Sequence, residues 1–295
     1  MKNSLRTVGD IYEFSMTVRR RDPIKEEIIR NLFGAAGFSP EQCSESVLPK
    51  GPWRIAVYLS TKQQVQGITA RLKKFPLKGV AVDCVRLRPS DWLEKWKTVI
   101  RPFNLTPHFR VVPTWSREQR SLSGKNVIHL NTTMAFGTGL HATTRMMARL
   151  IEECRGRFDS FLDVGTGTGI LGILAVKCGA QRVVGIDIQA ESIRTARENM
   201  VANQCRFELR QRGLQTFRSR EQFDFVAANL YSEDLIVLRE ELIRRVRPGK
   251  YLAVSGIAWN HWTKCRRAFA GLPLKCRKVL KEKKWTAALY QRSAS

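Results

Sequence analysis

The stretch from residue 161 to residue 187 constrains the fold of this chain more than any other feature of its sequence. A short apolar run at 161–164 breaks into a glycine-rich loop at 165–169, and a second apolar run at 182–186 ends in Asp187. This order of elements is typical of a nucleotide-type cofactor site: a strand, a tight loop, the start of a helix, and a second strand that ends in an acidic residue. Glycines let such a loop approach a ligand closely, and the carboxylate can accept two hydrogen bonds from a ribose diol. We therefore expect a cofactor to contact Asp187 and three loop glycines, Gly165, Gly167 and Gly169.

Strand-like and helix-like segments alternate from residue 158 to residue 270. Amphipathic helical patterns cover 190–203, 232–246 and 259–269, and short apolar strands are indicated at 205–209, 223–229 and 251–257. A closing hairpin is predicted at 276–283 and 285–291. Alternating strands and helices are typical of a doubly wound parallel sheet. The sequence therefore predicts a Rossmann-like α/β domain over 127–295.

The first 88 residues have a different order of elements. Apolar patterns predict strands at 11–18, 44–48, 53–59 and 80–87 and helices at 23–34 and 61–74. This β-α-β-β-α-β order is that of a small ferredoxin-like α+β sandwich, and no catalytic motif lies inside it. We predict a binding domain at 1–88, followed by a linker helix at 91–96 within a connecting segment at 89–126.

The chain is strongly basic. Its 295 residues include 51 Lys and Arg against 26 Asp and Glu, a formal net charge of +25. Such a charge indicates either an anionic partner such as RNA or a basic surface that is only solvated, and both readings stay open. The densest basic run extends from Lys264 to Lys284, where Glu282 is the one acidic residue.

Cysteine usage and hydropathy indicate the compartment. The seven cysteines are scattered and never spaced as Cys-x-x-Cys, so we expect no metal site and no disulfide framework. No apolar stretch approaches the roughly 18 to 20 residues of a membrane span, and no signal-peptide core follows the N-terminus. These features predict a soluble, cytoplasmic protein without membrane contact, and they leave the oligomeric state open.

Three further segments offer polar groups to the cofactor site. The glycine- and threonine-rich loop 134–144 ends where a helix begins, so Thr143 and Thr144 suit either a binding loop or a simple capping turn. Asn229 ends an apolar strand, where its side chain serves either as a site residue or as a cap of the strand end. Asp163 precedes the glycine loop and can cap its amides or accept from a ligand ammonium group. Because a dinucleotide usually prefers Gly-x-Gly-x-x-Gly, an Asp followed by Gly-x-Gly-x-Gly favours S-adenosylmethionine.

These motifs resemble a known family. The pattern from Asp163 to Gly169 resembles the first motif of class I methyltransferases. The loop Met-Ala-Phe-Gly-Thr-Gly-x-His-x-Thr-Thr at 134–144, with Ala-Asn-Leu at 228–230, resembles the ribosomal protein L11 methyltransferase family. Residues 131–133 are Asn-Thr-Thr, where members often have Asp-Pro-Gly. The resemblance implies S-adenosylmethionine as cofactor, with contacts from Thr144, Gly165, Asp187 and Asn229. It further implies an N-terminal domain that docks ribosomal protein L11, and N-methylation of lysine or α-amino groups of that protein.

The chemistry expected from this resemblance needs few protein groups. Methyl transfer from a sulfonium is an in-line displacement, so the protein mainly aligns and desolvates the partners. We expect the Asn229 carbonyl to accept a hydrogen bond from the amine and to aim its lone pair, which makes Asn229 the candidate catalytic residue. His141 serves either a structural hydrogen bond or proton transfer. Tyr231 either lines the acceptor pocket or packs beneath it.

Two other functions compete with protein methylation. An RNA methyltransferase would use the basic surface to hold rRNA phosphates, and unstacked bases would need exposed aromatic residues beside it. Only Trp262, Phe269 and Trp285 lie within or next to the basic run. A nonenzymatic ribosome-binding protein with a vestigial fold is the third candidate, and the intact motif positions argue against it.

Overall fold

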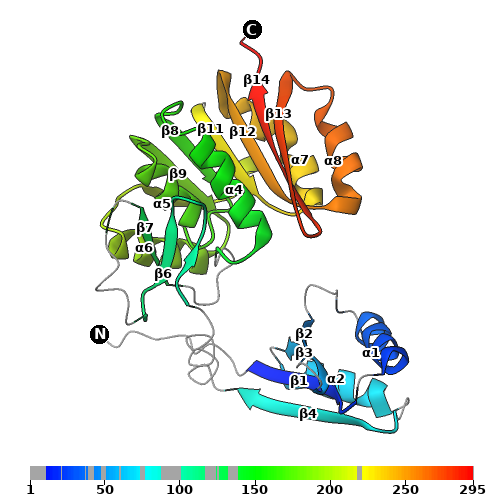
Figure 1. Cartoon of the computed structure of the whole chain (residues 1–295). Helices are drawn as coiled ribbons and strands as arrows, with labels where there is room; N and C mark the ends of the chain where they lie inside the picture. Colours follow the sequence, from blue (N-terminus) through cyan, green and yellow to red (C-terminus); the bar gives the residue numbers. More distant parts are fainter. Residues whose placement is uncertain are drawn as a thin grey trace. The chain divides into compact units, whose positions relative to one another are not determined.

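The chain folds as two compact units, residues 1–99 and 100–295 (Figure 1). The computed structural model describes residues 11–20, 22–36, 38, 43–47, 51–59, 61–73, 77–87, 101–116, 124, 126–131, 139–217 and 221–294. Of the connecting segment expected at 89–126, residues 89–99 belong to the first unit and 100–126 to the second. The linker helix predicted at 91–96 lies outside the described residues.

The first unit has the β-α-β-β-α-β order that the sequence predicts. Its elements are β1 (Ile11–Val18), α1 (Pro23–Ala35), β2 (Ser44–Val47), β3 (Trp53–Leu59), α2 (Lys62–Lys73) and β4 (Val80–Leu87). Pro23 opens α1, and the Asp22 side chain caps it by accepting from the Lys25 amide at 3.1 Å. The strands form one antiparallel sheet in the order β2-β3-β1-β4. The core of this unit includes Phe14, Phe33 and Trp53.

The second unit is built on a seven-stranded sheet in the order β10-β9-β8-β11-β12-β14-β13. The strands are β8 (Ser160–Val164), β9 (Arg182–Asp187), β10 (Glu208–Gln211), β11 (Phe223–Asn229), β12 (Val246–Ala258), β13 (Leu274–Glu282) and β14 (Trp285–Arg292). The first five strands run parallel, while β14 is antiparallel to both β12 and β13. The predicted Rossmann-like sheet is therefore confirmed, with the C-terminal hairpin as its antiparallel end.

Helices cover both faces of this sheet. The helices are α4 (Ala142–Glu153), α5 (Ile170–Lys177), α6 (Ala190–Ala202), α7 (Ser232–Arg244) and α8 (Trp262–Phe269). Figure 1 shows these helices packed along the sheet. One hydrophobic cluster joins α4 and α5 to the sheet, and a second joins α7 and α8 to it. Parallel strands buried on both faces are near-continuous apolar runs, which is the pattern of β8 and β11.

A small three-stranded sheet precedes α4 in the second unit. It consists of β5 (Phe103–Asn104), β6 (Arg110–Pro113) and β7 (Val127–Leu130), in that order. β5 pairs antiparallel with β6, and β6 pairs parallel with β7. Among the described strands, one edge of β7 is therefore left without a partner in this sheet.

Three predicted boundaries are wrong, each for a local reason. The strand expected at 205–209 is β10, which begins only at Glu208, because Gln204 adopts a left-handed φ of 52° and the Cys205 amide still bonds the Met200 carbonyl. The helix expected to reach residue 246 ends at Arg244. The strand expected from residue 251 begins at Val246 and includes Pro248 and Gly249.

All seven cysteines are free thiols. Burial raises the pKa of the Cys154, Cys178 and Cys265 thiols to about 11. Among the described residues, no helix combines the length and the apolar character that crossing a membrane requires.

Candidate functional site

The carboxyl end of β8 turns into a loop whose backbone requires glycine. Gly165, Gly167 and Gly169 have φ angles of 74°, 54° and 79°, in the left-handed region that side chains disfavour. The Gly165 amide donates to the Ile186 carbonyl at 2.9 Å. A Cβ on Gly169, the N-cap of α5, would lie 3.0 Å from the Ala196 Cβ. The loop is therefore held closely against β9 on one side and α6 on the other.

Asp187 lies beside this loop at the end of β9. Its Oδ2 accepts from the Gly167 amide at 3.0 Å, and its Oδ1 accepts from the Gln189 amide at 2.9 Å. The side chain is only partly buried. Because each carboxylate oxygen has further lone-pair capacity, the group can anchor the loop and still accept from a diol.

Asp163 lies beneath the loop, where only 1% of the residue is exposed. The Thr166 hydroxyl donates to its Oδ2 at 2.7 Å. Burial raises the pKa of Asp163 to about 7; the Thr166 hydrogen bond opposes that rise, and the nearby Asp187 charge adds to it. The contact seen for Asp163 is thus with a loop side chain.

Asn229 ends β11 next to the glycine loop. The following residue, Leu230, donates its amide to the Ser255 carbonyl of β12 at 3.1 Å. A Cβ on Gly165 would lie 2.6 Å from the Leu230 Cδ2, so the turn after Asn229 touches the loop. Gly256 in β12 has a φ of 90°, and a Cβ there would lie 2.0 Å from the Leu230 carbonyl oxygen.

Gly256 is a site-forming residue that the sequence analysis missed. It is an isolated glycine in an apolar strand, and the pairing of β12 with β14 shifts register between Val254 and Ile257. An isolated glycine in a strand pattern is a known indication of a bulge or a close backbone approach. The isolated glycine in the apolar run 251–257 could therefore have indicated this close approach.

The described end of the 134–144 loop reaches the same region. A Cβ on Gly139 would lie 3.0 Å from the Ile170 Cδ1, at the first residue of α5. The N-cap of α4 is His141, which makes no side-chain cap hydrogen bond to the described residues, so Thr143 and Thr144 lie in the first helical turn. The part of the loop at 132–138 lies outside the described residues.

His141 makes structural contacts. Its Nδ1 lies 2.7 Å from the Thr143 Oγ1, and its ring meets Trp285 edge-on at a centroid distance of 5.0 Å. Burial lowers the pKa of His141, and the positive charges of Arg145 and Lys283 lower it further. The imidazole is therefore neutral at pH 7 and joins α4 to the C-terminal hairpin.

Two buried polar atoms at the site, Thr144 Oγ1 and Asn229 Oδ1, have no hydrogen-bond partner within the described part of the chain. A buried polar atom without a partner costs free energy, so such atoms indicate a ligand. With the Asp187 carboxylate and the glycine backbone, they form a set of hydroxyl, amide and carboxylate groups. This set fits the amino-acid and ribose groups of S-adenosylmethionine.

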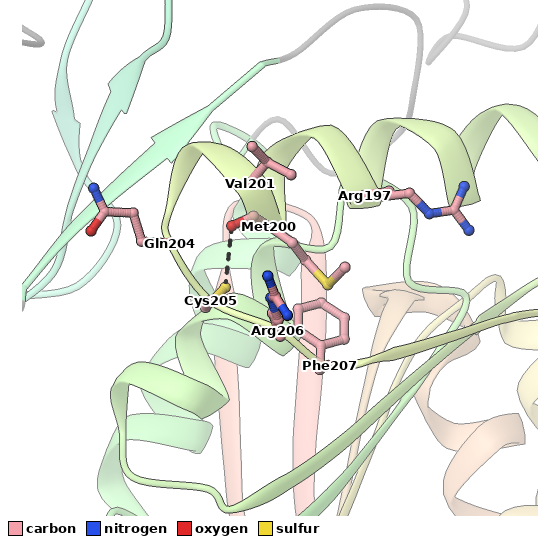
Figure 2. Close-up of a pocket in the computed structure, with 7 residues that line it drawn as sticks. All are labelled: Arg197, Met200, Val201, Gln204, Cys205, Arg206 and Phe207. Atoms are coloured by element: carbon pink, nitrogen blue, oxygen red, sulfur yellow. Dashed lines mark hydrogen bonds between the residues drawn. The ribbon is translucent and has the colours of Figure 1, made fainter.

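Tyr231 and the pocket at α6 do not belong to this set of polar groups. Tyr231 is 69% exposed at the N-cap of α7, so it does not pack beneath the site. Across the described ranges, no three His, Cys, Asp or Glu side chains are placed to hold a metal ion. A pocket of about 560 Å³ at the C-terminal end of α6 contains none of the predicted site residues; Figure 2 shows its lining by Arg197, Met200, Val201, Gln204, Cys205, Arg206 and Phe207.

Comparison with known proteins decides the family. The family model described as ribosomal protein L11 methyltransferase (PrmA) matches residues 30–293. The chain belongs to the ribosomal protein L11 methyltransferase family. It is 38% identical over 205 residues to a ribosomal protein L11 methyltransferase of Geobacter metallireducens, covering 70% of this chain and 67% of that relative. A Sorangium cellulosum protein of the same name is 33% identical over 245 residues, with 80% and 76% covered.

A solved structure agrees with this assignment. The crystal structure of a ribosomal protein L11 methylase from Lactobacillus delbrueckii subsp. bulgaricus superposes with a TM-score of 0.60 at 29% identity. The match covers 66% of this chain and all of that one. Membership in the L11 methyltransferase family makes this protein an S-adenosylmethionine-dependent methyltransferase, as the sequence predicts. RNA methylation is not favoured.

Proposed function

We propose that this protein transfers methyl groups from S-adenosylmethionine to lysine or α-amino groups of ribosomal protein L11. The observation that supports the proposal most directly is the buried Asn229 Oδ1, which lacks a partner among the described residues and lies next to the glycine loop of a chain in this family. An amide oxygen is an acceptor that an incoming amine can meet. Ribosomal proteins and free thiols are both usual in the cytoplasm, where we place the activity.

The proposed cofactor contacts follow from the site geometry. The backbone of the loop that contains Gly165, Gly167 and Gly169 contacts the ligand, and Asp187 accepts from the ribose hydroxyls. Thr144 and Asn229 supply the two buried polar atoms described above. Asp163 is assigned to the same site through the loop that it supports by way of Thr166. When bound, the sulfonium supplies a methyl group that is already activated for transfer.

Asn229 has the proposed catalytic role. Its carbonyl oxygen accepts a hydrogen bond from the acceptor amine and thereby orients the nitrogen lone pair. The amine reacts only when neutral, which is easier for an α-amine with a pKa of about 8 than for lysine with a pKa of about 10.4. We therefore expect α-amine methylation to dominate near neutral pH, and lysine methylation to increase as the pH rises.

Substrate docking is the proposed role of the first unit. The predicted domain at 1–88 has its own core and no catalytic motif, and its sheet has the ferredoxin-like strand order. A domain of this kind can hold a protein substrate while the second unit, with the methyltransferase region predicted at 127–295, performs the transfer. The predicted segment 89–126 connects the two.

The test uses labelled S-adenosylmethionine with purified L11 or with rRNA. We expect label in L11 alone, and label in RNA alone would disprove the proposal. Cofactor binding without label in either substrate would favour a nonenzymatic ribosome-binding role. Asn229→Ala is expected to lower turnover on L11 by at least about 100-fold with folding retained, because it removes the orienting acceptor. Wild-type turnover in that variant would remove Asn229 from the site.

A contact with rRNA beside L11 is proposed from the surface charge. Seven basic residues on α8, β13 and the β13–β14 turn are exposed, and within the described ranges no ion pair involves them: Lys264, Arg266, Arg267, Lys275, Lys281, Lys283 and Lys284. Exposed cations that are not held in ion pairs can neutralise phosphates and release counterions. The +25 charge is consistent with such a role.

The rRNA contact is tested by the salt dependence of binding. Replacing Lys275, Lys281 and Lys284 with alanine is expected to reduce the slope of log affinity against log salt by about 2 to 3. A matched triple replacement of Arg197, Arg206 and Arg212, exposed elsewhere on the second unit, is the control. Equal slopes in the two variants would refute the contact.

A further inference from the structure

Two asparagines, Asn199 on α6 and Asn203 at its C-cap, hydrogen-bond the edge of β7 that has no neighbouring strand among the described residues. Asn203 Oδ1 accepts from the His129 amide at 2.9 Å, and its Nδ2 donates to the His129 carbonyl at 2.6 Å. One helical turn earlier, Asn199 Oδ1 accepts from the Asn131 amide at 2.6 Å, and its Nδ2 donates to the Asn131 carbonyl at 3.2 Å. Each side-chain amide therefore binds both backbone groups of one residue, as a neighbouring strand would.

The helix repeat of about four residues and the strand repeat of two residues make this pairing possible. Residues four apart on a helix are displaced by about 6 Å along its axis. Residues two apart on a strand are displaced by about 6.6 Å and present their backbone groups to the same edge. The distance between Asn199 and Asn203 along the helix is thus close to the distance between Asn131 and His129 along the strand. Both side chains can therefore reach the edge of β7 while the helix and the strand keep their regular backbone geometry.

Each of the two side-chain amides has a second acceptor, and Asn203 Nδ2 donates to the Asn199 carbonyl of its own helix at 2.8 Å. Asn199 instead reaches the glycine loop. Its Nδ2 also donates to the Thr168 carbonyl of the glycine loop at 2.8 Å. A side-chain amide has two N–H donors, so both acceptors are served at once. Asn199 is completely buried, and Ala196, one turn earlier on α6, packs against Gly169. The same face of α6 therefore holds both the glycine loop and β7.

We propose that Asn199 is a positioning residue for the cofactor: it fixes the glycine loop by tying the Thr168 carbonyl to the end of β7. The proposal rests on the proposed function, because it assigns the glycine loop to S-adenosylmethionine. Asn199 lies behind the loop and acts through it. Its effect is therefore on cofactor affinity, through a loop backbone held in the binding conformation.

The two asparagines provide a matched pair of variants. Asn199→Ala and Asn203→Ala each remove one buried amide and leave two β7 backbone groups unpaired, so both are expected to lower the thermal unfolding midpoint. Only Asn199→Ala removes the side-chain hydrogen bond to the Thr168 carbonyl. In the full-length protein, titration calorimetry with S-adenosylhomocysteine is expected to show an affinity loss of about tenfold or more for Asn199→Ala and less than about twofold for Asn203→Ala.

A second variant covers the case in which Asn199→Ala does not fold. Asn199→Asp keeps the size and the acceptor for the Asn131 amide but removes the donors. We expect the same affinity loss at pH 8. A protonated carboxyl regains one donor, which can serve the Thr168 carbonyl, and burial raises a carboxyl pKa. The ratio of variant to wild-type dissociation constants is therefore expected to fall as the pH is lowered to about 5.5. A purely structural defect would not recover in this way.

The outcomes separate this inference from the proposed function. Wild-type protein that fails to bind S-adenosylhomocysteine would overturn the proposed function and this inference together. Wild-type binding with equal affinity losses in Asn199→Ala and Asn203→Ala, or no recovery of Asn199→Asp at low pH, would overturn the positioning role alone.

Discussion

At the residue scale, Asp187 stabilises the fold and is also proposed to bind the cofactor. Asp187 holds the loop through the Gly167 amide and also accepts from the Gln189 amide. The sequence predicted its position at the strand end because the motif spacing is local. It did not predict that both oxygens already hold backbone amides, because such contacts depend on how the loop folds back onto β9.

Replacing Asp187 with alanine tests its cofactor role. We expect Asp187→Ala to weaken S-adenosylhomocysteine binding by at least about 100-fold, since two charge-assisted hydrogen bonds contribute about 1.5 to 3 kcal/mol each. Titration calorimetry measures the affinity, and Asp159→Ala, which removes an exposed carboxylate before β8, is the control. Unchanged affinity in Asp187→Ala would mean that the ribose is held elsewhere.

Asp163 is expected to make stability depend on pH. Its folded-state pKa is raised from 3.8 to about 7 by burial, so the folded protein keeps a proton that the unfolded chain releases. The resulting stabilisation is fully present below about pH 4 and is lost as the pH rises to 7. A neutral amide at this position does not titrate and has no such loss. The Asp163→Asn variant should therefore gain up to about 4 kcal/mol relative to wild type between pH 4 and pH 8.

Urea unfolding of wild type and Asp163→Asn across this pH range measures the effect. The free energy of unfolding is compared at each pH, so that other titrating groups cancel in the difference. A difference that stays constant with pH would contradict the assigned burial of this carboxyl.

At the scale of elements, the order of strands and helices follows from local patterns, whereas contacts between residues far apart in the chain do not. The strands, helices and hairpin of the second unit follow from local apolar patterns, which is why their order was predicted. The start of β10 was not, because Gln204 and Cys205 extend the end of α6 through a left-handed residue. Two other contacts join residues that are far apart in the chain. Gly256 packs against Leu230, and Asn199 makes two hydrogen bonds to Asn131 at the end of β7. No local pattern specifies such pairs.

Gly256 and Gly249 provide a test of the β12 contact. Both lie in β12 with φ angles of 90° and 76°, but a Cβ on Gly249 meets nothing within 4 Å among the described residues. Gly249→Ala is expected to cost about 1 kcal/mol of stability from its backbone conformation alone. Gly256→Ala should cost at least about 3 kcal/mol and abolish methyl transfer, because the Leu230 turn must move. Denaturant unfolding and the L11 assay measure both, and equal effects would contradict the contact.

At the scale of the whole molecule, each unit has its own core. The clusters around α4–α5 and α7–α8 lie within residues 100–295, and the cluster around Phe14 and Trp53 lies within residues 1–99. We predict that a fragment of residues 100–295 unfolds cooperatively and binds S-adenosylhomocysteine within about threefold of the full chain. Its kcat/KM on L11 should fall by at least about tenfold, because the docking unit is missing.

Calorimetry and the methylation assay on this fragment separate the two roles. Full L11 activity in the fragment would show that the first unit does not dock the substrate. Loss of cofactor binding in a folded fragment would show that the first unit contributes to the cofactor site.

The order of strands at the C-terminal end of the sheet has a consequence for synthesis. β14 lies between β12 and β13, although it is the last strand of the chain. During translation, β13 therefore emerges before the strand with which it pairs. This hairpin also contacts α4 and its N-cap, through Glu282 to Arg145 and Arg149 and through Trp285 to His141. A nascent chain in which β12 has emerged thus carries every predicted site residue before the hairpin that contacts α4 can form.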